Sequence, residues 1–129
     1  MIAMYYYKKS VNIPFAAAIP KVKDALKKEG FGVLTEIDVK ATLKEKLNID
    51  TDQYQILGAC NPLLAHKALQ AEQDLGLMLP CNMIVYVKDG KTFVAAIKPT
   101  VQMAKIGNPK LQEIAVQVED KLKKVVDSI

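Results

Sequence analysis

The sequence predicts an α+β domain with a mainly antiparallel β-sheet and helices packed mostly on one face of it. Two observations predict this: strand-like and helix-like segments alternate along the chain, and an Asp-Gly turn joins two consecutive apolar runs. The order of the expected elements is β-α-β-α-β-α-β-β-α-α. A hairpin within such an order favours antiparallel pairing, with the helices segregated to one face. The 129 residues have the size of one domain, which we expect to span residues 1–129.

The N-terminal segment predicts a strand and then a helix. Residues 5–11 are aromatic and β-branched, which is typical of a strand. Apolar residues then recur at helical spacing: Phe15, Ile19, Val22 and Leu26. Gly30 is placed to end this helix in the left-handed conformation. Pro20 lies inside the pattern, where it predicts either a kink or a later start of the helix.

A second strand and a short helix are expected next. Residues 31–37 have the composition of a strand, in which alternation puts Leu34 and Glu36 on one face and Val33 on the other. Asp38 is placed to accept hydrogen bonds from the first amides of the following helix. The apolar positions of that helix are Val39, Leu43 and Leu47.

The third strand, residues 53–59, runs into Cys60 and then into an Asn-Pro pair. Asparagine is a favoured N-cap and proline a favoured first residue of a helix. Asn61 and Pro62 therefore predict a helix that reaches to about Gln73.

The C-terminal half predicts a hairpin and two helices. Asp89 and Gly90 separate two apolar runs, and an Asp-Gly pair in that position is the strongest short-range signal for a β-hairpin. A short helix begins at Pro99, and a second Asn-Pro pair, Asn108 and Pro109, opens the last helix. The last helix carries one apolar stripe: Leu111, Ile114, Ala115, Val118, Leu122, Val125 and Val126.

The composition argues against several classes of protein. All 18 basic residues are lysines, so the chain lacks the guanidinium groups that grip phosphate and read guanine edges, and we expect no nucleic-acid partner. No apolar stretch approaches the roughly 20 residues of a membrane-spanning helix, and no signal peptide is evident. We expect a soluble, cytoplasmic protein with no membrane partner. In that reducing compartment Cys60 and Cys81 are expected to be free thiols.

Three sequence blocks are specific in combination. They are GFGVLTEIDV at residues 30–39, LGACNP at residues 57–62 and LPCN at residues 79–82. Together they resemble the signature blocks of the domain-of-unknown-function 302 (DUF302) family, and the resemblance covers nearly the whole chain. It implies an α+β fold whose biochemical role is unassigned, so it supplies a fold and not a function.

Cys60 gives the sharpest chemical signal. It falls at a strand end just before a helix N-terminus, where the helix dipole favours a reactive thiolate. The alternative is a small, buried apolar side chain, which cysteine often is. Cys81 shares its strand face with Met83, which is typical of a core position. If the two strands are antiparallel neighbours, the pairs Cys60-Asn61 and Cys81-Asn82 become adjacent.

Two carboxylates and one histidine are further candidates. Glu72 continues the spacing of the apolar positions on its helix. A carboxylate on that apolar stripe must be paired, hydrated or functional. The alternative is that Glu72 lies at the helix end and bends out to water. Glu36 has the same ambiguity on its strand. His66, the only histidine, lies on a polar stripe and is expected at the surface. No C-x-x-C or H-x-x-x-H spacing is present, so the signal for a metal is weak.

The sequence therefore predicts a small ligand-binding domain, with a small molecule or a metal ion as ligand. The expected site gathers six residues at the strand ends: Glu36, Cys60, Asn61, Glu72, Cys81 and Asn82. A homodimer is expected, because a small chain that is half hydrophobic has few places to bury surplus apolar surface. The alternatives are a thiol-dependent enzyme or redox protein that uses Cys60, and a structural or interaction domain without a small-molecule site. No pattern identifies a catalytic residue, a substrate or a cofactor.

Overall fold

A computed structural model describes residues 4–129. Five antiparallel strands form one sheet in the order β1-β5-β4-β3-β2. The strands are β1 (Tyr6–Val11), β2 (Gly32–Asp38), β3 (Tyr54–Cys60), β4 (Cys81–Lys88) and β5 (Lys91–Ile97). The α-helices are α1 (Phe15–Lys28), α2 (Val39–Leu47), α3 (Pro62–Ala71), α4 (Pro99–Gln102) and α5 (Pro109–Asp127). The predicted fold class and element order are confirmed, and two short 3-10 helices, η1 (Gln73–Met78) and η2 (Ala104–Ile106), are additions to them.

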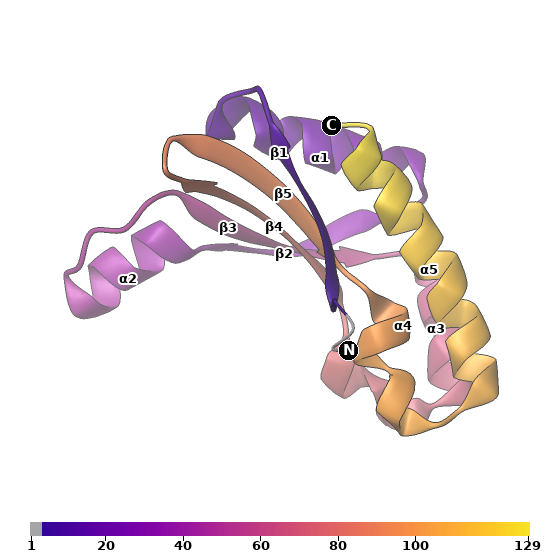
Figure 1. Cartoon of the computed structure of the whole chain (residues 1–129). Coiled ribbons are helices and arrows are strands. Elements are labelled where there is room, and N and C mark those ends of the chain that lie inside the picture. Colours follow the sequence, from indigo (N-terminus) through magenta and orange to yellow (C-terminus); the bar gives the residue numbers. More distant parts are fainter. Residues whose placement is uncertain (1–3) are drawn as a thin grey trace.

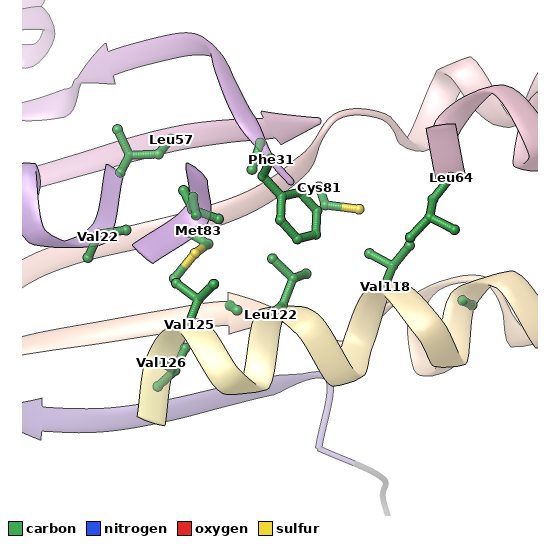
Figure 2. Close-up of a cluster of buried hydrophobic side chains, with 14 of the residues drawn as sticks. Val22, Phe31, Leu57, Leu64, Cys81, Met83, Val118, Leu122, Val125 and Val126 are labelled. Atoms are coloured by element: carbon green, nitrogen blue, oxygen red, sulfur yellow. The ribbon is translucent and has the colours of Figure 1, made fainter. Parts of the chain in front are cut away.

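The hydrophobic core lies between one face of the sheet and the helices α1, α3 and α5 (Figure 1). Leu57 of β3, Met83 of β4 and Val94 of β5 point into it and are fully buried. Val22 of α1 and Leu122 of α5 close it from the helix side, as Figure 2 shows for part of the cluster. The whole predicted stripe of α5 is buried. This face of the sheet is called the core face below.

Helix α1 begins at Phe15 and runs through Pro20, so the alternative of a later helix start is wrong. Its end is as predicted. Gly30 has a φ of 84°, and the amide of Phe31 donates to the carbonyl of Leu26 over 2.9 Å. This left-handed cap turns the chain back and buries the Phe31 ring against the core.

Strand β2 departs from the predicted alternation. The pairing register with β3 shifts between Val33, which pairs with Ala59, and Thr35, which pairs with Gly58. A β-bulge at Leu34 therefore puts Val33 and Thr35 on opposite faces, although alternation predicts the same face for both. Val33 packs against the core. A bulge is defined by the pairing of two residues on one strand with one on its partner, and the pattern of a single strand does not contain this pairing. The sequence therefore does not predict the bulge.

The C-terminal half follows the prediction. Asp89 and Gly90 both have positive φ, 51° and 76°, and form the turn of the β4–β5 hairpin. Gly107, with a φ of 70°, ends the segment before α5. Within residues 4–129, no helix combines the length and the apolar character needed to cross a membrane.

Each Asn-Pro pair connects two helices. The Asn61 side chain accepts a hydrogen bond from the Leu64 amide over 3.2 Å, and its Nδ2 donates to the carbonyl of Glu29 at the end of α1. Asn108 accepts from the first amides of α5, and its Nδ2 donates to the carbonyl of Ala71 over 2.9 Å. Each asparagine thus caps one helix and satisfies a terminal carbonyl of an earlier one.

Helix α2 differs from the other helices. Asp38 caps it as predicted, accepting from the Ala41 amide over 2.9 Å. The helix buries none of its nine residues. In Figure 1 it extends away from α3, α4 and α5. Its apolar residue Leu47 is exposed, as is Ile49 in the loop that follows.

Candidate functional site

An apolar cavity of about 350 Å³ lies where the ends of β3 and β4 meet α3 and α5. Leu64 and Ala68 of α3 form one wall, and Ala115 and Val118 of α5 form another. Phe31, turned inward by the cap of α1, also lines the cavity. The side chains that line it carry no formal charge. An interior of this kind favours an uncharged, apolar occupant, because a charge without a partner is costly to desolvate.

Strands β3 and β4 bring two cysteines to this cavity. Ala59 pairs with Cys81 in the antiparallel register, and Cys60 is the next residue along β3. Both cysteines line the cavity. The chain between them forms α3 and η1 and then returns to the sheet. The end of β3 therefore meets the start of β4, as expected for antiparallel neighbours.

Cys81 is buried, and Figure 2 shows its sulfur pointing toward the space between Phe31 and Leu64. Burial, and to a smaller extent the charge interaction with Cys60, raise the pKa of the Cys81 thiol to about 11. At neutral pH this group is a neutral thiol. It behaves as a small apolar side chain and a weak hydrogen-bond donor, and not as a nucleophile.

Cys60 is half-buried at the cavity wall, immediately before the N-cap of α3. Asn61 follows it and also lines the cavity. The two hydrogen bonds of Asn61, to the amide of Leu64 and the carbonyl of Glu29, explain its presence by folding alone. No comparable capping role explains the presence of a thiol at Cys60.

Three of the predicted site residues lie away from the cavity lining. Glu36 is exposed on the edge strand β2, where it forms a 2.8 Å ion pair with Lys23. Glu72 is the residue after the last turn of α3, so the helical stripe predicted for it ends before it. Asn82 pairs with Gly58 and points to the face opposite the core, because successive strand residues alternate. The structure brings Cys60, Asn61 and Cys81 together, and not the other three. His66 is exposed, as predicted.

The cavity itself was missed by sequence analysis. Apolar residues that line a cavity have the same spacing as those of a packed core, so no periodicity distinguishes them. Two of them give a structural signal: Leu34 is 67% exposed and Leu69 38% exposed, so the cavity opens to solvent beside them. The β-bulge places Leu34 there. The unpredicted η1 supplies Leu75, which is fully buried at the far wall.

A metal site is not formed by the described residues. Across residues 4–129, no group of three or more His, Cys, Asp and Glu side chains is arranged to hold a metal ion. Cys60 and Cys81 supply two sulfur atoms, whereas protein zinc sites commonly use three or four protein ligands.

The family model described as "Domain of unknown function DUF302" matches residues 7–129. The chain belongs to this family. Among solved structures, this DUF302 chain is similar to the crystal structure of an uncharacterized conserved DUF302 protein from Bacillus stearothermophilus, with 35% sequence identity and a TM-score of 0.92. The match covers 97% of this chain and 98% of that one. Among curated proteins, none matches the chain. The DUF302 fold expected from the three sequence blocks is thus confirmed, and the comparisons assign no reaction.

Proposed function

We propose that this DUF302 chain is a ligand-binding module whose cavity takes a small, uncharged, apolar molecule. The observation that carries the proposal is the apolar cavity of about 350 Å³. Protein interiors are packed as densely as organic crystals, and voids larger than a water molecule are few. Small-molecule sites begin at about 300 Å³, so the cavity has the size of such a site. An empty cavity of this size would cost stability.

The cavity lining selects the chemistry of the ligand. No lysine, aspartate or glutamate lines it, so an ionic group would enter without a partner. The polar atoms at its wall belong to Cys60, Cys81 and Asn61. Cys81 is a neutral thiol, and Asn61 is engaged by backbone groups, so both offer a ligand only weak polar contacts. A hydrocarbon-like body with a single weakly polar or soft group fits this lining.

Two adjacent residues of α3 provide a matched test. Ala65 lines the cavity, and His66 is exposed on the same helix. Ala65→Phe places a ring in the cavity, whereas His66→Phe places the same ring in solvent. The probe is a neutral solvatochromic dye such as Nile red, and circular dichroism checks that both variants fold.

The expected result is that the wild type and His66→Phe bind the dye, and that Ala65→Phe binds it on the order of ten-fold more weakly or worse, since about 1.4 kcal/mol corresponds to ten-fold. Equal binding by the two variants, or no binding by the wild type, would refute the proposal. Mass spectrometry of protein isolated under native conditions then identifies any apolar molecule that it carries.

A thiol-dependent enzyme or redox protein is the second candidate. The observation that favours it is that Cys60 shares the cavity with Cys81 and stands before the N-terminus of α3. In that case Cys60 is the nucleophile, because Cys81 is protonated at neutral pH. Loss of a measured turnover in Cys60→Ser, with ligand binding retained, would favour this candidate over a binding module.

We also propose that the chain forms a single domain, acts as a homodimer and works in the cytoplasm. The size and hydrophobic composition support the first two proposals. The two free cysteines support the third. A chain that binds no small molecule in the dye titration would instead be a structural or interaction domain.

A further inference from the structure

The face of the sheet opposite the core is called the outer face. It consists of the strand residues that alternate with the buried ones. Its central rows follow from the strand register: Ile37, Ile56, Ile84 and Ala95 in one row, and Tyr54, Tyr86 and Phe93 in the next. Except for the small Ala95, these side chains are only partly buried, and Ile37 is 46% exposed. An apolar sheet face of this extent is uncommon on a monomer surface.

The outer face is apolar in its centre and polar at its edges. On the edge strand β1, the first row ends in Lys8 and the second in Ser10. The hairpin end is bordered by the facing pair Lys88 and Lys91. This pattern of an apolar centre and a polar rim is the usual anatomy of a protein–protein interface.

The aromatic row is ordered before any partner arrives. The rings of Tyr54 and Tyr86 stack at 5.3 Å, and those of Tyr86 and Phe93 at 5.2 Å. Lys8 reaches across β5, so that its Nζ donates to the Tyr86 hydroxyl over 3.2 Å and lies 5.5 Å from the Phe93 ring centre. The ammonium group is thus already partnered by aromatic groups, which lowers the cost of removing it from water. Preordered aromatic side chains lose little entropy on binding.

The outer face supplies more than half of the area that a stable dimer needs. Five strands about 4.8 Å apart, each about six residues of 3.4 Å, give a flat projection of about 500 Å². The relief of the side chains increases the accessible area above this value. A typical specific interface buries about 800 Å² on each partner. Helix α2 follows the edge strand β2 directly and buries none of its residues within the protomer. It therefore adds exposed apolar surface, including Leu47, beside the β2 edge of the sheet.

We propose that a second copy of this chain covers the outer face, with the two sheets stacked about a two-fold axis. A two-fold axis uses the same patch on both copies, so one apolar face is sufficient. Sheets pack face to face at about 10 Å when their facing side chains are apolar. The proposal is independent of the cavity, which opens on the core side of the sheet.

The test uses two exposed residues of nearly equal accessibility. Ile37 lies on the outer face and is 46% exposed, whereas Val116 lies on α5 and is 47% exposed. In a folded protomer, aspartate at either position stays hydrated, so Ile37→Asp and Val116→Asp should fold equally well by circular dichroism. Ile84→Asp, in the middle of the outer face, is the stronger variant if it folds.

Sedimentation equilibrium at increasing protein concentration gives the mass. The wild type and Val116→Asp should have about twice the chain mass of 14.2 kDa. In Ile37→Asp the dimer dissociation constant should rise on the order of 100-fold, because each dimer buries two unpaired carboxylates. A wild-type mass of 14.2 kDa at high micromolar concentration, or equal dimer dissociation in Ile37→Asp and Val116→Asp, would overturn the proposal.

Discussion

Cys60 and Cys81 line one cavity from adjacent antiparallel strands, although all of α3 and η1 separates them along the chain. Their surroundings differ. Cys81 is buried next to Met83 on the core face, and Cys60 is half-buried beside the N-cap of α3. The cavity is therefore lined by one buried thiol, that of Cys81, and one more accessible thiol, that of Cys60.

Alkylation should distinguish the two thiols. In Cys60→Ala, the remaining Cys81 should react slowly with iodoacetamide at pH 8, and its rate should keep rising well above pH 9, because burial is the larger cause of its raised pKa. In Cys81→Ala, the remaining Cys60 should react faster at pH 8, because it is less buried. Mass spectrometry measures both rates. A Cys81 rate that levels off below pH 9 would show that the cavity is wetter than its lining indicates.

The raised pKa of Cys81 also predicts a pH dependence of stability. In the unfolded chain the thiol loses its proton near pH 9, whereas in the folded protein it keeps it until about pH 11. The unfolded state therefore binds fewer protons between these values, so stability present below pH 9 is lost as the pH rises toward 11. The loss should amount to about 2 to 3 kcal/mol.

Other groups titrate in the same range, so the control is Cys81→Ala. Urea unfolding of both proteins at pH 8 and at pH 10.5 measures the difference. The wild type should lose more stability than Cys81→Ala over this interval. Parallel losses would contradict the burial of a protonated thiol at this position.

Asn61→Ala should lower the free energy of unfolding by about 1 to 2 kcal/mol. It removes the cap of α3 and leaves the Glu29 carbonyl without its donor. Asn61→Asp keeps an oxygen for the Leu64 amide but has no donor for the Glu29 carbonyl, so it should recover only part of the loss. Urea unfolding gives the stability, and the dye titration gives the binding. If Asn61→Ala instead lost dye binding at unchanged stability, Asn61 would be a ligand-binding residue and not a cap.

Gly58→Ala should destabilise the sheet by about 1 to 3 kcal/mol. A Cβ at Gly58 would lie 2.7 Å from Cγ of Pro80, and it would also collide with the Thr35 side chain. Gly32→Ala is the matched control in β2, because a Cβ there meets no atom within 4 Å. Thermal unfolding compares the two. A melting temperature for Gly58→Ala equal to that for Gly32→Ala would mean that the strand ends near Pro80 adjust freely.

Much of the fold could be predicted from local patterns. The capping residues Asp38 and Asn61, the turn at Asp89 and the glycine cap at Gly30 each specify a local conformation through their own side chain or lack of one. The stripe of α5 was predictable because helical periodicity is regular over its 19 residues. Each of these signals depends on residues within a single element or turn, and not on contacts between distant segments.

The site was predictable only in part, because it depends on pairings between distant segments. Cys60 and Cys81 could be expected to meet once β3 and β4 were taken as antiparallel neighbours. Asn82 was expected beside Cys81, but strand alternation sends it to the outer face. Glu72 was placed by a helical spacing that ends one residue before it. The bulge at Leu34 and the 3-10 helix η1, which shape the cavity, have no local pattern that marks them.

The central claim is that a small apolar molecule occupies the cavity, and methyl NMR tests it most directly. Leu64, Ala68 and Val118 line the cavity, whereas Ile56 and Ile84 lie on the outer face. On titration with a neutral apolar probe, we predict that the methyl signals of the three cavity residues shift in a saturable way and that those of the two isoleucines do not. Cavity methyl signals that stay unchanged up to the solubility limit of the probe would contradict the claim.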